Sequence, residues 1–198
     1  MGKTIITIIA ILTSLFNYCQ EGVTVPLNHP NKSGITNGTY ISDLNDDFIP
    51  YIGTWQGTWN DKVFTLKIEK IPHFTETYPN GDYYYRDILI GNYIVTDLSG
   101  ELELANSLAI TDPDLAKIRS MFRPFNNYFS FNYSNESLCS VRFIVNLSRN
   151  LSNPNELIYS VGDRDYWEEE GCPYESINDI PVPIPTSLTS PLILTKIN

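Results

Sequence analysis

The chain of 198 residues is acidic: 23 Asp and Glu stand against 13 Lys and Arg, for a net charge of −10 at pH 7. Binding to nucleic acid needs clustered Lys and Arg that displace counterions from the phosphates. The charge balance therefore argues against nucleic acid and against anionic membrane surfaces as partners, while the length suffices for one domain with a substantial core.

The N-terminal segment carries a short apolar stretch behind a single positive charge. Lys3 precedes residues 5–16, which are apolar apart from one Ser and two Thr. This stretch is shorter than the roughly 20 residues that a membrane-spanning helix needs, so we expect residues 1–20 to be a secretory signal peptide. Cleavage near Cys19 or Gln20 is the preferred expectation, and a lipid-anchored Cys19 is the alternative. Either route predicts export to the periplasm, the cell surface or the extracellular medium.

Residues 21–47 are rich in Asn, Gly, Pro and Ser and predict an extended lead-in to a single domain over residues 48–198. The domain opens with a strand in which Gly-Thr-Trp occurs twice, at 53–55 and 57–59. A second strand over residues 62–71 follows after only Asn60 and Asp61. A two-residue turn predicts a β-hairpin in which facing residues have numbers that sum to 121.

This register places apolar side chains on one face of the hairpin and polar ones on the other, as in a half-buried antiparallel sheet. The inward glycines, Gly53 and Gly57, would leave room on the apolar face. The candidate ligand-binding residues on that face are Trp55, Trp59, Phe64, Leu66 and Ile68.

The rest of the chain also alternates strands with turns. A long strand over residues 83–96 should turn at 97–100 into a strand over 101–105, with Leu102 and Leu104 inward. Asp112 and Pro113 resemble a helix start, and we expect one short helix that buries Leu115, Ile118 and Phe122. Further strands are expected over residues 127–133, 141–147, 157–161 and 192–197. The pattern predicts an all-β antiparallel meander that forms a closed or half-open barrel.

The segment from Phe48 to Trp55, with Gly53-Thr-Trp55 at the entrance to the first strand, resembles the Gly-x-Trp signature of lipocalins. In those proteins the tryptophan closes one end of an eight-stranded cup that holds a small apolar ligand. The resemblance implies a lipocalin-like barrel with Trp55 at its floor. Lipocalins also carry an arginine on the last strand, where this sequence offers only Lys196.

A broader likeness covers most of the chain. The leader ending in Gln20-Glu21, the Gly-Thr-Trp hairpin, the Tyr-rich strand 83–93 and the Pro-rich run 180–185 are similar to a family of small exported bacterial proteins classed as a domain of unknown function. That resemblance implies export and a β-rich fold, and it brings no activity.

Few residues point to chemistry. His29 and His73 lack a third histidine or a cysteine cluster for zinc, and the sequence holds no nucleophile elbow or phosphate loop. We therefore expect no enzymatic activity, no cofactor and no metal site. The acidic run 162–171 contains Asp163, Asp165 and Glu168, which would serve as a weak calcium loop or as a solvated surface loop.

The cysteines left after cleavage, Cys139 and Cys172, predict a disulfide in an oxidising compartment. The competing interpretations are two buried free thiols or one reactive thiol.

Consecutive tyrosines 83, 84 and 85 must alternate between the two faces of their strand. Tyrosine combines an apolar ring with a polar hydroxyl, which suits partner contact, although it also fills sheet faces in exported β proteins. These features leave two functional hypotheses: a non-catalytic cup for a small apolar molecule, or a surface module that binds a protein or a glycan through exposed tyrosines.

Overall fold

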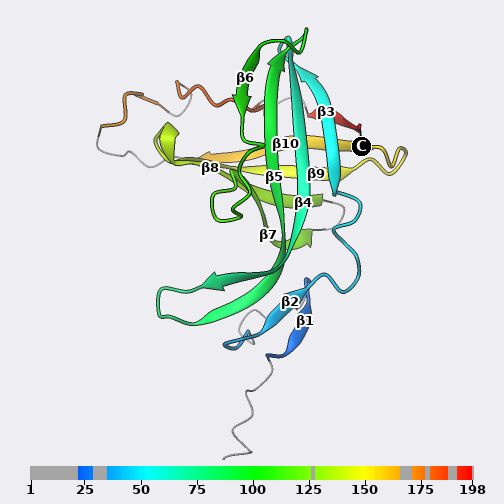
Figure 1. Ribbon diagram of the computed structural model, residues 1–198, viewed down its shortest axis with the longest axis vertical. Helices are drawn as coiled ribbons and strands as arrows, with labels where there is room; N and C mark the ends of the chain where they lie inside the picture. Colours follow the sequence, from blue (N-terminus) through cyan, green and yellow to red (C-terminus); the bar gives the residue numbers. More distant parts are fainter. Residues whose placement is uncertain are drawn as a thin grey trace, which may run out of the picture.

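The computed structural model describes residues 22–28, 35–125, 128–165, 171–176, 179–186 and 191–197. In these residues the only helical segment is a single short 3-10 turn, η2, and the rest of the regular structure is β-strand (Figure 1). The elements are β1 (Thr24–Pro26), β2 (Tyr40–Ser42), β3 (Gly53–Trp59), β4 (Lys62–Thr77), β5 (Tyr83–Asp97), β6 (Glu103–Asn106), β7 (Ile118–Phe125), β8 (Tyr128–Asn135), η2 (Glu136–Leu138), β9 (Val141–Arg149), β10 (Glu156–Asp165) and β11 (Leu192–Lys196).

Eight of the strands form a closed antiparallel barrel of the lipocalin-like kind, which confirms the predicted fold class. Around the wall the order is β5, β4, β3, β11, β10, β9, β8 and β7, and β7 pairs back with β5. Apart from the excursion through β6, chain order is wall order, because each antiparallel hairpin brings the next strand beside the last.

Strand β5 carries three neighbours in succession along one edge. It pairs with β2 at Tyr85, with β7 at Gly91 and with β6 at Val95. Strand β4 has a bulge between Ile71 and Phe74, and beyond it the ends of β4 and β5 leave the barrel. These ends form with β2 and β1 a small sheet below the barrel, which we call the arm (Figure 1).

The first hairpin has the predicted register. Gly53 faces Ile68, Trp55 faces Leu66 and Gly57 faces Phe64, so the facing numbers sum to 121. At the turn Asn60 has φ 45° and Asp61 has φ 57°. Two consecutive left-handed residues make the turn whose twist matches that of the strands, and Asn and Asp tolerate this conformation best after glycine.

The lumen of the barrel is occupied by the chain's own side chains. Phe64 packs edge-on against Tyr159, with ring centroids 5.6 Å apart, and Tyr133 stacks on Phe143 at 4.5 Å. One continuous core joins the strands, and its largest fully buried side chains include Trp55. The buried Tyr159 hydroxyl donates to the Pro185 carbonyl at 2.9 Å, so the Pro-rich run covers this part of the core.

The barrel glycines allow close approach of neighbouring strands. A Cβ at Gly57 would lie 2.6 Å from the Ile193 carbonyl oxygen and 2.9 Å from Leu194 Cδ2. A Cβ at Gly91 would lie 3.0 Å from Ile118. The space that the sequence reserves on this face is therefore taken by β11 and β7, where the barrel closes.

Two local predictions are wrong. Asp112 and Pro113 form only a turn, with the Leu115 amide donating to the Asp112 carbonyl at 3.1 Å, and the expected helix is instead strand β7. Pairing with β5 and β8 outweighs the local helix signal, because the chain gains a ladder of hydrogen bonds on both edges. Leu102 and Leu104 are exposed, since β6 pairs only with β5 and lies outside the barrel wall.

Within the expected lead-in, β1 and β2 are strands of the arm, and Ile41 and Asp43 are buried. The predicted disulfide is present: Cys139, after η2, bonds Cys172 with an S–S distance of 2.12 Å. It fastens the loop after β10 to the β8–β9 turn. Among the described residues no helix is long and apolar enough to cross a membrane.

Candidate functional site

The five residues proposed to bind a ligand come together on β3 and β4 as predicted. The side chains of Phe64, Leu66 and Ile68 are at most 1% exposed and belong to the packed core. Trp59, at the end of β3, is half-buried, with the Lys62 ammonium 5.2 Å from its ring centroid. The structure thus assembles this wall and covers it with the chain's own side chains.

Trp55, which the likeness to lipocalins singles out, is fully buried in the core. Its indole N–H donates to the Tyr51 carbonyl at 2.8 Å. Lys196 Nζ sits 5.2 Å from the Trp55 ring centroid and donates to the Ile52 carbonyl at 2.9 Å. These two contacts of Lys196 fasten β11 to the start of β3.

The buried tyrosine hydroxyls stay protonated near neutral pH. Burial raises the pKa of Tyr51 to about 12, with smaller contributions from charged neighbours. Burial also raises the pKa of Tyr93 and of Tyr133, whose hydroxyls contact each other. In the core, the Tyr133 hydroxyl accepts a hydrogen bond from the Asn135 side-chain amide at 3.3 Å.

A different set of aromatic side chains reaches the surface on the arm. Tyr83 and Tyr85 point outward from β5 while Tyr84, between them, is buried, as strand alternation predicts. The His73 ring stacks on Tyr85 with centroids 4.1 Å apart and contacts Tyr40 at 4.6 Å. Tyr83 meets Tyr85 edge-on at 5.6 Å. We call Tyr40, His73, Tyr83 and Tyr85 the ring patch.

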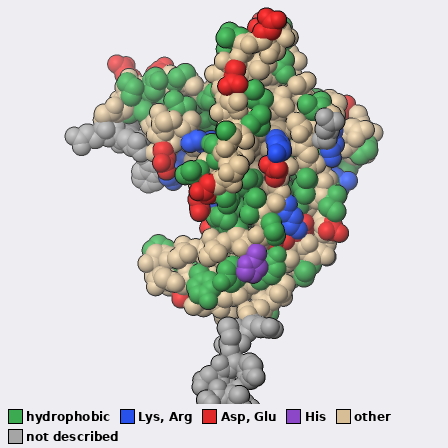
Figure 2. Space-filling model, viewed as in Figure 1, with side chains coloured by type: hydrophobic (Ala, Val, Ile, Leu, Met, Phe, Trp, Pro, Cys, Tyr) green, Lys and Arg blue, Asp and Glu red, His purple; other side chains and the backbone are tan. Residues whose placement is uncertain are grey.

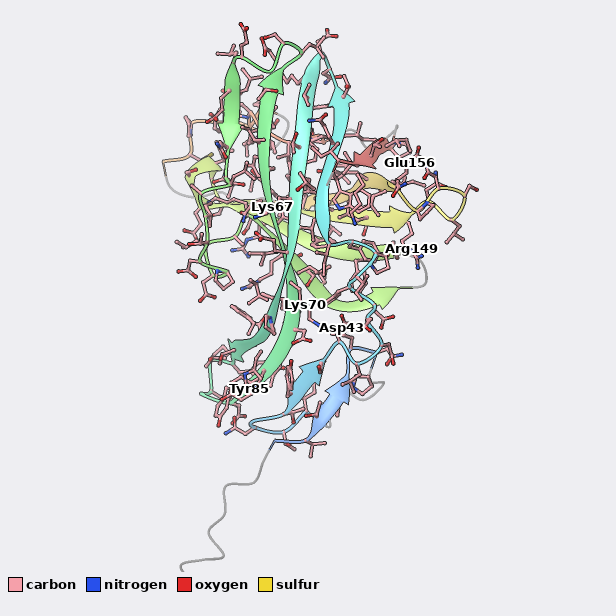
Figure 3. All side chains as sticks on the ribbon, turned by 45° about the vertical axis from the view of Figure 1, so that its right-hand side comes forward. Asp43, Lys67, Lys70, Tyr85, Arg149 and Glu156 are labelled. Carbon is pink, nitrogen blue, oxygen red and sulfur yellow. A yellow bond between two sulfur atoms is a disulfide. The ribbon has the colours of Figure 1, made fainter. Side chains whose placement is uncertain are left out.

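The ring patch lies on one face of the arm. Figure 2 shows the histidine among hydrophobic side chains below the barrel, and Figure 3 places Tyr85 in the arm, beyond the bend of β4 and β5. His73 is exposed and has φ 56°, in the left-handed region, at the β4 bulge. The bulge adds a residue to β4 and so turns the imidazole toward the two tyrosines.

Behind the ring patch, the buried Asp87 carboxylate links Tyr40 and His73. Asp87, 2% exposed, accepts hydrogen bonds from the Tyr40 hydroxyl at 2.5 Å, the His73 amide at 3.2 Å and the Asp43 amide at 3.0 Å. It also forms an ion pair with Lys70 at 3.0 Å. Burial by itself raises the pKa of Asp87, but these hydrogen bonds outweigh it and lower the pKa below its ordinary value.

Asp43 is the third member of this charged cluster, and we call Asp43, Lys70 and Asp87 the ionic anchor. Its carboxylate accepts the amides of Asp47 at 2.7 Å and Phe48 at 3.3 Å, and it contacts Lys70 Nζ at 3.3 Å. Figure 3 shows Asp43 and Lys70 side by side at the junction of barrel and arm. The two carboxylates around one ammonium fasten residues 40–48 to the bend of β4 and β5, which keeps the Tyr40 ring in place.

Sequence reasoning found only part of this arrangement. Alternation predicts that the tyrosines of residues 83–85 divide between the two faces of their strand, but it does not tell which face is outward, and Tyr40 and His73 lie far from them in the sequence. The sequence carries no local signal for this cluster, since Asp43, Lys70 and Asp87 are far apart in the chain and each looks like ordinary surface charge.

The part of the chain that the structure describes contains no group of three or more His, Cys, Asp or Glu side chains placed to hold a metal ion. His29, Cys19 and the side chains of Asp163, Asp165 and Glu168 lie outside the described residues.

Comparison with curated proteins and with solved structures found no match. The sequence profile of a family of unknown function, DUF6705, matches residues 1–143.

Proposed function

The chain belongs to the DUF6705 family, whose function is unknown, and we propose from its geometry that it is an exported, non-catalytic barrel that binds a protein partner through the ring patch. The observation that carries the proposal is the gathering of four partly exposed rings from β2, β4 and β5 over one buried ionic anchor. Tyrosine-rich surfaces of this kind are typical of protein interfaces, because tyrosine adds contact area at a low cost in side-chain entropy.

The mutual orientation of the rings favours a protein over a glycan. A sugar that stacks on an aromatic side chain needs an open ring face, yet His73 covers one face of Tyr85 at an interplanar angle of 25°. Tyr83 meets Tyr85 edge to face, at an interplanar angle of 71°. Edges and hydroxyls suit the mixed apolar and hydrogen-bonding contacts of a protein surface.

The packing of the barrel supports this surface role over a ligand cup. A small-molecule cup needs roughly 300 Å³ or more of interior space. Here Phe64 and Tyr159 meet across the lumen, and β11 and β7 take the space beside Gly57 and Gly91. An exported location is supported by the Cys139–Cys172 disulfide and by the apolar leader.

The test compares three forms of the mature chain that are purified from the native host and immobilised. These are the wild type, a Tyr83→Ser and Tyr85→Ser double variant, and a Tyr78→Ser control, in which an exposed tyrosine of the same hairpin outside the patch is changed. Quantitative mass spectrometry identifies the host proteins that each form retains, and thermal unfolding checks that all three are folded.

We expect the wild type and the Tyr78→Ser control to retain the same partner and the double variant to lose it. Equal retention by the double variant would refute the proposal. Glycan arrays probed with the same three forms give the second comparison, and binding there that depends on Tyr83 and Tyr85 would replace the protein partner by a glycan. A small molecule released only on denaturation, seen by native mass spectrometry, would favour the cup.

A further inference from the structure

A cleft of about 410 Å³ opens on the outer face of β7, β8 and β9, away from the packed lumen. Arg119 of β7, Asn132 and Ser134 of β8 and Arg142 of β9 contribute outward-facing residues. This volume falls within the range of small-ligand sites. The cleft shares no residue with the ring patch, so a ligand bound in the cleft would be independent of the proposed function.

The lining of the cleft contains two positive and two negative side chains. The positive ones are Arg119 and Arg142, and the negative ones are Asp114 and Glu136. Arg119 contacts Asp114 over 3.7 Å, longer than a good hydrogen bond, and its guanidinium lies 5.3 Å from the Phe74 ring centroid. The Phe74 ring packs against the Arg119 guanidinium from the arm side and so orients its N–H donors.

One wall of the cleft is a turn that the fold holds in place. Glu136 lies in η2, and Ser140 comes just before the start of β9. Cys139 and Ser140 both have left-handed backbones, with φ of 52° and 48°, which is costly for residues other than glycine. The Cys139–Cys172 disulfide fastens this turn, so the wall is formed before any ligand arrives. A preformed wall lowers the entropy lost on binding.

We propose that this cleft binds a small zwitterion, an amino acid or a dipeptide with free termini. A ligand of single charge would find as many repelling as attracting groups in the lining. A zwitterion can place its carboxylate on a guanidinium, which binds carboxylates through paired N–H donors, and its ammonium on Asp114 or Glu136. The Asn132 amide and the Ser134 hydroxyl offer hydrogen bonds to a peptide group between the two ends.

The test titrates the full mature, oxidised protein with three probes of matched shape, monitored by two-dimensional amide NMR. The probes are alanyl-alanine, its N-acetyl form, which lacks the ammonium, and its C-terminal amide, which lacks the carboxylate. We expect alanyl-alanine to shift the amides of β8, β9 and the intervening turn in a saturable way. Both capped forms should bind about tenfold more weakly or worse, because each loses one charge-assisted hydrogen bond.

Two arginine variants locate the site. Arg142→Gln should weaken alanyl-alanine binding by about tenfold or more, whereas Arg149→Gln, at the other end of β9 and in a different cleft, should leave it unchanged. Absence of saturable shifts with alanyl-alanine, equal binding of the capped forms, or unchanged binding by a folded Arg142→Gln protein would each overturn the proposal. Thermal unfolding of both variants establishes that they are folded.

Discussion

Replacing Gly57 by alanine tests whether β11 closes the barrel as the structure shows. The added Cβ would lie 2.6 Å from the Ile193 carbonyl oxygen, a backbone atom that cannot move without shifting β11, and 2.9 Å from Leu194 Cδ2. Overpacking of this kind costs about 1–3 kcal/mol. A Gly→Ala change also restricts the unfolded chain, which stabilises the fold by about 0.4–1 kcal/mol. The difference is a loss of up to about 2.6 kcal/mol, and we expect Gly57→Ala to lower the free energy of unfolding within this range.

Gly162→Ala is the matched control. Gly162 also lies in a barrel strand, β10, but a Cβ there would meet its nearest neighbours at 3.6 Å, an ordinary contact distance. We expect this variant to be as stable as the wild type or more stable, by up to about 1 kcal/mol. The assay is equilibrium unfolding in urea of the oxidised proteins, monitored by tryptophan fluorescence. If Gly57→Ala proved as stable as Gly162→Ala, the close crossing of β3 and β11 would be wrong.

Three further substitutions test the closure, the anchor and the disulfide. Lys196→Ala removes the donor to the Ile52 carbonyl and should lower the free energy of unfolding by about 1–2 kcal/mol in urea, with Lys196→Arg retaining most of it. Asp87→Asn should cost roughly 3 kcal/mol at pH 7, because it breaks a buried ion pair. The pKa of Asp87 is lower in the folded chain than its ordinary value, so the stability it contributes is present above that value and is lost as pH falls through the folded pKa. Urea midpoints of the wild type and Asp87→Asn should therefore converge in acid, and a constant gap would refute this assignment. A Cys139→Ser and Cys172→Ser double variant opens a loop with a sequence separation of 33 and should lose about 3–4 kcal/mol, and the intact protein should be about 2 Da lighter than its reduced form by mass spectrometry.

The successful and failed predictions differ in how far their physical causes extend along the chain. The hairpin register depends on two adjacent turn residues and an alternating pattern, both of which act within about ten residues. The short helix was predicted from equally local signals at Asp112 and Pro113, but pairing of Ile118 with Gly91 of β5 decided that segment. Local signals hold where no distant strand competes for the same backbone groups.

By itself, the sequence determined the all-β class, the register of β3 and β4, the cysteine pair and the placement of Tyr84 on the opposite strand face from Tyr83 and Tyr85. These depend on side-chain alternation, turn chemistry and the two cysteines that lie outside the apolar N-terminal stretch. Only the tertiary structure decided which groups meet: Lys196 on Trp55, His73 between Tyr40 and Tyr85, and two carboxylates on Lys70. The reason is that closing the barrel and bending β4 at its bulge set distances between residues far apart in the chain, and no local pattern encodes those distances.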